Sequence, residues 1–285
     1  MCTSRLCQAA RVRFWMSGCI RACFRVSKLQ SRAGIRGRGD YSSFTGENVI
    51  EESEISPRQN QLLAGLPLTI QASFFPHLKL KYLPFGKVLC ESGQVLRQAY
   101  FPIDSIVALL NVTQGGSSTE ISMVGNEGLV GASVLLGGER AITTVLVQNE
   151  GHAYSLSALR LRTEFNSDSE MRNHLLRYIQ ARFINMAQLA VCNRRHSVQQ
   201  QLCRWLLSSL DRLHGNQLIV TQELIASLLG VRRPGVTEAA SKLQELGVIE
   251  YKRGHLTVLD RSKLEKLSCE CYAIVRTETD RIAAF

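Results

Sequence analysis

Short apolar runs separated by polar turns fill the chain between residues 78 and 156. In residues 78–83 apolar and polar side chains alternate, which is the pattern of a half-buried strand. Similar runs recur at spacings of roughly 8–12 residues, with glycine-rich turns between them. The predicted strands cover 78–83, 88–91, 99–102, 105–113, 118–124, 143–148 and 152–156, and two short helices over 60–66 and 70–77 precede them. Many short strands with such turns are typical of a β-sandwich or jelly roll.

Beyond residue 156 apolar residues recur at steps of three and four, which indicates an amphipathic helix. This helix is predicted over 168–192, with Asp168 among the residues able to cap its N-terminus. Its apolar stripe consists of Met171, Leu175, Tyr178, Ile179, Phe183, Met186, Leu189 and Ala190. The stripe needs a partner, which is the chain's own strands, the same helix of a second subunit in a coiled coil, or both. A second helix over 197–213 ends near Gly215.

Two further short helices joined by a tight turn are predicted after residue 220. Thr221 can cap the first of them, and Glu223 in its first turn complements the helix dipole. Gly230 ends that helix at a position where glycine adopts a positive φ without a steric cost. The second helix begins at residue 232 or 233 and runs to residue 246, where another glycine follows.

The spacing within this segment indicates a helix-turn-helix. Ala226 is small where two helices cross closely, Gly230 follows in the turn, and Val236 packs the second helix onto the first. An ordinary helical hairpin, the alternative, does not require these three residue types at these offsets. The rest of the small core is supplied by Leu224, Ile225, Leu228, Leu229, Val231, Ala239, Ala240 and Leu243.

A basic hairpin follows the second helix. Two short β runs over 248–251 and 256–259 are joined by Lys252-Arg253-Gly254-His255, a turn that can face a phosphate backbone. A plain solvated hairpin is the alternative for these side chains. Together the segments predict a winged helix-turn-helix from about Thr221 to Val258.

The chain has 285 residues, of which 45% are hydrophobic, and this suits two modest globular domains or one large one. No run reaches the roughly 18–20 apolar residues of a membrane-spanning helix, so we expect no membrane partner. The net charge is +10, but residues 1–40 hold nine basic side chains against Asp40 alone, which leaves only +2 for the rest. An argument for DNA binding therefore depends on local charge and motif geometry.

Residues 1–55 differ in composition from the rest, with arginine, serine, glycine and cysteine enriched before an acidic stretch. Three interpretations stay open: a disordered basic arm, an artefactual upstream start with Met16 as the internal alternative, and an organellar targeting peptide. The nine cysteines are odd in number and no clear secretory signal precedes them, so we expect a cytoplasmic protein with mostly free thiols.

The order of strands, long helix, helix-turn-helix and wing resembles the Crp/Fnr superfamily of bacterial regulators over about residues 59–272. Three strings resemble one branch of it: CNRRHSVQQQL at 192–202, LGVRRPGV at 229–236 and CECY at 269–272. The resemblance implies an α+β protein with an N-terminal double-stranded β-helix (jelly roll), a long dimerisation helix and a C-terminal winged helix-turn-helix. The implied domains are a basic extension (1–55), a cyclic-nucleotide-binding-like β-roll (56–165), the dimerisation helix (166–196), the DNA-binding domain (197–268) and a C-terminal tail (269–285).

In this superfamily the second helix of the motif lies in the DNA major groove, and its early residues read base edges. The predicted DNA-binding residues are Thr221, Gln222, Arg232, Arg233, Pro234, Thr237, Lys252, Arg253 and His255. An arginine on the recognition helix can bond guanine O6 and N7, and Arg233 is assigned this role. Arg232 can equally hold a phosphate, as can Thr221 and Gln222 at the start of the first helix.

One position departs from the superfamily pattern. Many members carry a glutamate early in the recognition helix that accepts a hydrogen bond from cytosine, whereas Pro234 followed by Gly235 stands here. Proline is tolerated in a first turn because its missing N–H has no intrahelical partner there. Neither residue can make the side-chain contact, so we expect an operator that differs from the superfamily consensus.

Cyclic-nucleotide-binding members hold the ribose through a Gly-Glu pair and the phosphate through an Arg-Ser or Arg-Thr pair. The nearest matches, Gly125, Glu127, Gly128 and Arg140, make up the predicted effector pocket. The glutamate is displaced by one residue and Ala141 lacks the hydroxyl. We therefore expect a degenerate pocket that binds no cyclic AMP, with Arg140 either meeting another anion or simply solvated.

Other members carry an iron–sulfur cluster on N-terminal cysteines, but the wide gap between Cys7 and Cys19 here argues against one. A thiol redox switch at Cys269 and Cys271 stays open. No metal-ligand spacing, phosphate-binding loop or nucleophile motif stands out, so we expect no metal, no cofactor and no enzymatic activity. The expected partners are double-stranded DNA, a second subunit and, for an activator, RNA polymerase. A sensor of the same superfamily or a ligand-binding module without DNA is the alternative.

Overall fold

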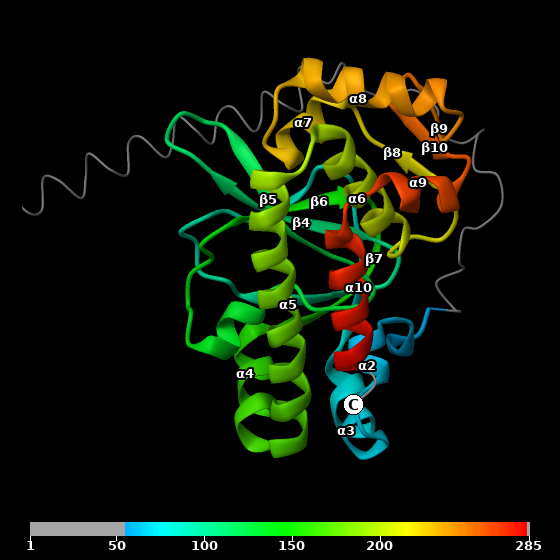
Figure 1. Cartoon of the computed structure of the whole chain (residues 1–285). Helices are drawn as coiled ribbons and strands as arrows, with labels where there is room; N and C mark the ends of the chain where they lie inside the picture. The colour runs from blue at the N-terminus through cyan, green and yellow to red at the C-terminus, as the bar shows by residue number, and fades with distance from the viewer. Residues whose placement is uncertain (1–54, 284–285) are drawn as a thin grey trace, which may run out of the picture.

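The structure, a computed structural model, describes residues 55–283 (Figure 1). The three interpretations of the N-terminal segment, and the cysteines within it, lie outside the described residues. A strand-rich unit comes first, a long helix follows, and a helical unit with a small sheet completes the chain. Within 55–283, no helix has an apolar stretch that could cross a membrane.

The strand-rich unit consists of two antiparallel sheets, of strand order β1-β7-β3 and β2-β6-β4-β5. The strands are β1 (Lys79–Leu83), β2 (Val88–Cys90), β3 (Gln98–Pro102), β4 (Ile106–Val112), β5 (Ser118–Val124), β6 (Thr144–Asn149) and β7 (Gly151–Ser157). Buried side chains of both sheets form one core, in which the Phe74 and Phe101 rings meet edge to face with centroids 6.2 Å apart. The predicted β-roll is confirmed, with each strand within two residues of its expected position.

Short helices close the ends of this roll: η2 (Pro57–Gln59), α2 (Gln61–Ala64), α3 (Leu68–Phe74), η3 (Phe75–His77) and η4 (Ala132–Leu136). Asn60 anchors the first two to the strands. Its side-chain oxygen accepts from Leu63 N and caps α2, while its amide donates to the carbonyls of Pro102 and Gly128. A fully buried asparagine with these partners is satisfied rather than costly.

Two helices leave the roll in succession, α4 (Ala158–Ser167) and α5 (Ser169–Arg195). The capping side chains of Ser157 and Asp168 start them, as the sequence predicts for the second. The apolar stripe of α5 is divided between two faces. Its first half is buried in the roll, where the Tyr178 hydroxyl bonds both the N–H and the carbonyl of Leu129, whereas Phe183 is 55% exposed.

The C-terminal unit has the predicted order of helices and wing. It consists of α6 (Val198–Leu210), β8 (Gln217–Ile219), α7 (Gln222–Leu229), α8 (Arg233–Glu245), β9 (Ile249–Lys252), β10 (His255–Val258) and α9 (Arg261–Leu267). Strand β8 was not predicted, and it pairs with β10 to make a sheet of order β8-β10-β9. It escapes a period-based prediction because only Leu218 of its three residues is buried.

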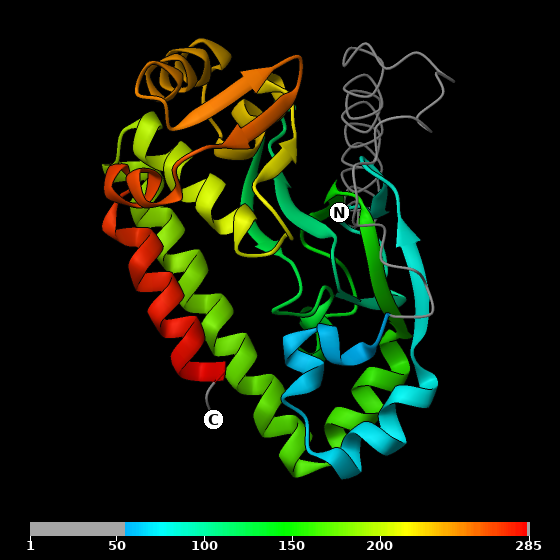
Figure 2. The same ribbon diagram turned by 90° about the vertical axis from the view of Figure 1, so that its right-hand side faces the viewer.

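The segment expected to be a tail from residue 269 is instead the helix α10 (Glu270–Ala283), which runs back along α5 (Figure 2). Cys271 and Tyr272 are buried at its start and hold it in place. The Tyr272 hydroxyl donates to Asp211 at 3.0 Å and accepts from Arg261 at 2.8 Å, so the helix is tied to α6 and α9 as well.

The C-terminal unit is docked onto the β4–β5 side of the roll, and one apolar core runs through both. Ile106, Ala108 and Met123 of the sheet belong to the same cluster as the side chains of α6, α7 and α8. Trp205 is a fully buried member of this cluster and donates from Nε1 to the buried carboxylate of Glu120 at 3.4 Å. Burial raises the pKa of the Glu120 carboxyl, and nearby Arg204 acts in the opposite direction.

Gly230 lies at a point of close approach between the two units. It has a φ of 67°, and a Cβ placed there would lie 2.6 Å from Oγ1 of Thr119 in β5. Gly247, which ends α8, has a φ of 68° but nothing within 4 Å of the same added atom. The two glycines thus share a backbone conformation and differ only in the neighbouring sheet.

We predict that Gly230→Ala lowers the free energy of unfolding more than Gly247→Ala does. Both pay about 1–2 kcal/mol for alanine in the left-handed region, and Gly230→Ala adds an overpacking cost of about 1–3 kcal/mol against the stiff β-branched Thr119. Urea unfolding of both variants measures the difference, and Thr119→Ala should remove the excess. Equal costs for the two glycines would show that this docking is absent in solution.

Candidate nucleic-acid interface

The turn between α7 and α8 has the geometry expected of a helix-turn-helix. Thr221 Oγ1 accepts from Leu224 N at 3.2 Å and starts α7. Gly230 ends it in the left-handed conformation, and Val231 N donates to the Ala226 carbonyl at 3.0 Å. Val236 is fully buried against α7. The three residues that suggested the motif therefore occupy the crossing, the turn and the packing face assigned to them.

Helix α8 lies along the outer edge of the molecule, above α7 (Figure 1). Arg232, Arg233 and Pro234 are exposed, and no side chain caps the N-terminus of this helix. Nε of Arg233 lies 4.0 Å from a carboxylate oxygen of Glu223, and both side chains are more than 60% exposed. An exposed pair at this distance is weak, so the guanidinium is available to a ligand.

Thr237 and Gln222 meet across the two helices. The Thr237 hydroxyl lies 2.7 Å from Oε1 of Gln222 and 3.1 Å from the carbonyl of Arg233, and its single hydrogen serves one of them at a time. The contact orients the Gln222 amide beside the start of α8. The predicted polar residues of both helices are thus brought to one surface.

The wing is a tight hairpin whose two-residue turn is Arg253-Gly254. Both residues have a positive φ, 50° and 85°, as a type I′ turn requires. Lys252, Arg253 and His255 are exposed, although the Lys252 ammonium is paired with Glu250. The Tyr251 hydroxyl donates to the Val220 carbonyl at 2.8 Å and ties the wing to the start of α7.

The structure does not assemble the predicted effector pocket. Glu127 accepts from Arg212 at 2.8 and 2.9 Å, and its other oxygen accepts from Gly125 N at 3.0 Å. Gly128 packs so closely that an added Cβ would lie 2.4 Å from the Tyr178 hydroxyl. Glu127 and Arg212 thus form a largely buried contact between the roll and the segment after α6, and both carboxylate oxygens of Glu127 already have partners within the protein.

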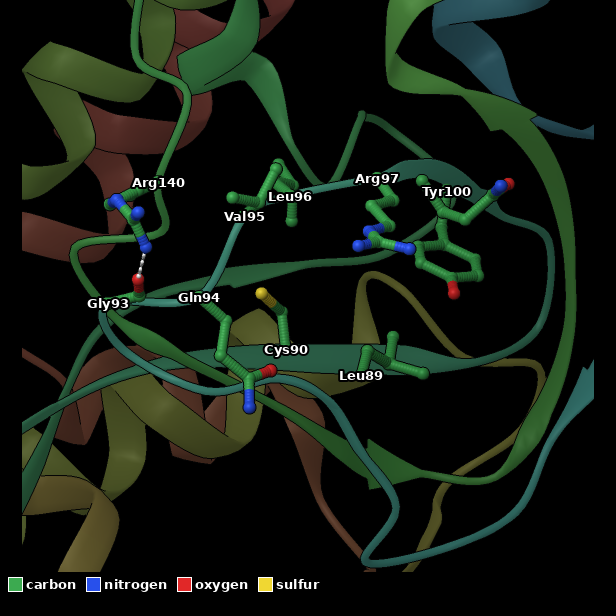
Figure 3. A pocket seen from close by; sticks show the side chains of 10 residues that line it. Leu89, Cys90, Gly93, Gln94, Val95, Leu96, Arg97, Tyr100 and Arg140 are labelled. Carbon is green, nitrogen blue, oxygen red and sulfur yellow. Dashed lines mark hydrogen bonds between the residues drawn. The ribbon is translucent and has the colours of Figure 1, made fainter. Parts of the chain in front are cut away.

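Arg140 lines a different cavity, of about 550 Å³, at the β2–β3 side of the roll (Figure 3). Its guanidinium donates to the Gly93 carbonyl at 2.8 Å. Arg97 and Tyr100 also line this cavity, and none of its described lining residues is a carboxylate. Sequence reasoning found Arg140 but missed Arg97, whose only signal was a positive charge close to a predicted strand.

Comparison with known proteins agrees with this architecture. Residues 200–267 match the family described as the Crp-like helix-turn-helix domain. No curated protein matches the chain. FixK2 from Bradyrhizobium japonicum superposes with a TM-score of 0.59 at 13% identity, covering 67% of this chain and 98% of that one.

Two further solved structures are similar to the described residues. A putative Crp/Fnr-family transcriptional regulator from Eubacterium rectale has a TM-score of 0.58 at 17% identity, covering 72% of this chain and 96% of that one. The c-di-GMP-responsive regulator CLP of Xanthomonas campestris has a TM-score of 0.56 at 16% identity, covering 68% and 100%.

The chain is thus a two-unit protein with a β-roll and a winged helix-turn-helix. Its helix-turn-helix domain is Crp-like, and its fold is that of the Crp/Fnr transcription regulators. The predicted resemblance to the Crp/Fnr superfamily is confirmed for the helix-turn-helix domain and for the fold.

We predict that the full chain binds neither cyclic AMP nor cyclic di-GMP at micromolar concentration. Glu127 is held by Arg212, and Ala141 offers no hydroxyl beside Arg140. Isothermal titration of each nucleotide into the protein measures this. A sub-micromolar dissociation constant for either one would mean that the roll rearranges to admit the ligand.

Proposed function

We propose that this protein is a dimeric, sequence-specific DNA-binding transcription regulator of the Crp/Fnr type that performs no catalysis. The observation that carries the proposal is the exposed first turn of α8, held by the helix-turn-helix geometry and flanked by the basic wing. Double-stranded DNA is the ligand that suits a projecting helix with two arginines at its start.

Each polar residue of this surface has a role in the proposal. Arg233 reads a guanine through its two guanidinium nitrogens, a contact worth about 1–3 kcal/mol of discrimination. Arg232 and the N-terminus of α7 at Thr221 hold phosphates, and Gln222 and Thr237 act together as one polar pair. Lys252, Arg253 and His255 of the wing add contacts to the backbone of the adjacent groove.

Pro234 and Gly235 restrict the operator. They occupy the first turn of α8 and provide no hydrogen-bonding side chain. Arg233 and Thr237, on either side, therefore supply the base contacts. The operator accordingly differs from one read by a glutamate at this place.

We predict that Arg233→Ala abolishes sequence preference and leaves the weak, salt-sensitive binding to arbitrary DNA. Mobility shifts with an operator selected by the wild-type protein, against a scrambled duplex, measure the ratio of the two affinities. The loss for the operator should be about 10-fold or more. Arg162→Ala is the control, since Arg162 is exposed on α4, at the far end of the molecule from α8. An unchanged preference in Arg233→Ala would refute the assignment.

Dimerisation through α5 is part of the proposal. Leu176 and Phe183 are 41% and 55% exposed, and Ala187 and Ala190 continue the same exposed line at steps of seven, four and three residues. This is the spacing of a coiled-coil seam. Helix α10 covers a different face of α5, at Gln188 and Cys192, and leaves the seam free.

We predict that Phe183→Glu converts a dimer into a monomer. A carboxylate at the centre of an apolar seam loses the buried aromatic contact and places two like charges together. Light scattering coupled to size-exclusion chromatography gives the mass directly. Leu159→Glu, at a side chain that is 76% exposed on α4, is the matched control and should remain dimeric. A strictly monomeric wild-type protein would rule out this dimer interface on α5.

The cavity beside Arg140 supports a second role, that of a degenerate effector site. Among its described lining residues are two guanidinium groups and no carboxylate, which favours a small anion other than the cyclic nucleotides. If the regulator is an activator, RNA polymerase is its further partner.

A further inference from the structure

Three cysteines and a histidine converge where α5 ends and α10 begins. They are Cys192 and His196 on one side and Cys269 and Cys271 on the other. Their four ligand atoms all lie within 4.8 Å of one another. The two halves are separated by 77 residues in the chain, from Cys192 to Cys269, so a short sequence motif does not reveal these four residues as a metal site.

The separations fit four ligands around one tetrahedral ion. With metal–sulfur and metal–nitrogen bonds of about 2.3 and 2.0 Å, neighbouring ligand atoms of such a site lie about 3.5–3.8 Å apart. Sγ of Cys192 and Sγ of Cys269 are 3.5 Å apart, and Sγ of Cys271 is 3.4 Å from Nδ1 of His196. The sulfurs are too far apart for a disulfide, whose bond is about 2.05 Å.

The histidine is oriented as a ligand would be. Its Nε2 lies 3.2 Å from a carboxylate oxygen of Glu270, while Nδ1 faces the sulfurs. Donation of the Nε2 hydrogen to Glu270 leaves the Nδ1 lone pair directed at the centre of the group. A carboxylate behind the imidazole is the usual outer partner of a metal-bound histidine.

The sulfurs are shielded and partly balanced in charge. Cys192 and Cys271 are fully buried and Cys269 is 4% exposed, and the three form an apolar cluster of their own. Gln188 donates from Nε2 to Sγ of Cys271 at 3.2 Å. The buried guanidinium of Arg204 lies close enough to Cys192 for its positive charge to stabilise a negatively charged thiolate there.

We propose that Cys192, His196, Cys269 and Cys271 bind one zinc ion in a closed, tetrahedral site. Three thiolates and one imidazole are a donor set that zinc takes in structural sites, where no position stays open for water. The ion joins the last turn of α5 to the first turn of α10. His196 is also the residue at which the chain turns from α5 into the DNA-binding unit, so the ion fixes that junction.

Metal analysis of the full chain tests the site. The protein is purified in reductant without chelator, and zinc is measured by inductively coupled plasma mass spectrometry. We expect about one zinc per chain. Cobalt(II) exchanged into the site should give an intense visible ligand-field band and a thiolate charge-transfer band in the near ultraviolet.

A double variant, Cys269→Ser with Cys271→Ser, should lose the zinc and the cobalt bands. Cys90→Ser is the matched control, because Cys90 is also a buried free thiol but lies in the β-roll. The N-terminal cysteines stay in every protein, so zinc retained by the double variant would place the metal elsewhere and overturn the proposal. Zinc-free wild-type protein without cobalt bands, iron–sulfur absorption, or a Cys192–Cys269 disulfide in place of the metal would overturn it as well.

Glu270→Gln provides a test that keeps all four ligands and does not depend on the double variant folding. Loss of the outer carboxylate should weaken zinc affinity about 10- to 100-fold in competition with a chromophoric chelator. Glu278→Gln, on the same helix in an exposed pair with Arg281, should leave the affinity unchanged. Equal affinities of the two variants would count against His196 as a ligand.

Discussion

The packing of α6 against the β4–β5 edge of the roll is the constraint on which the arrangement of the protein depends. Trp205 reaches the buried carboxylate of Glu120, and two turns of chain later Arg212 reaches Glu127. They lie beside a second apolar cluster, distinct from the core between the two sheets, in which Ile106, Ala108 and Met123 of the roll pack against the C-terminal unit. The direction in which α8 projects therefore follows from how a sheet and a helix pack some distance away from it.

The charged groups at this junction act on orientation more than on stability. Removing an ion pair such as Glu127–Arg212 from water costs about as much as the pairing returns. An apolar contact tolerates small rotations, whereas Glu127 is held at both oxygens, Oε1 by Nε and Nη2 of Arg212 and Oε2 by the N–H of Gly125, which restricts its geometry. Gly125 and Glu127, which resemble part of a ligand site in sequence, thus take part in a contact between the two units of the protein.

Features encoded by local patterns were predictable from the sequence, and features created by distant contacts were not. The strands, the caps at Thr221 and Asp168 and the turn at Gly230 each depend on a few neighbouring residues. Helix α10 was missed because its start is fixed by Tyr272 bonding to Asp211, 61 positions earlier. The proposed zinc ligands and the Glu127–Arg212 contact arise in the same way, from segments that only folding brings together.

The first turn of α8 has a consequence for how such a regulator shares a cell with others of its fold. Without a carboxylate at this helix position, a DNA-binding protein cannot accept the hydrogen bond that a cytosine amino group offers, so an operator with that cytosine is not bound more tightly. The proposed contacts to the phosphate backbone do not depend on this position, so binding to arbitrary DNA is expected to be retained. If the proposed function holds, Pro234 and Gly235 lower the affinity of this protein for operators selected by a relative with a glutamate there, and so separate the two sets of target sites.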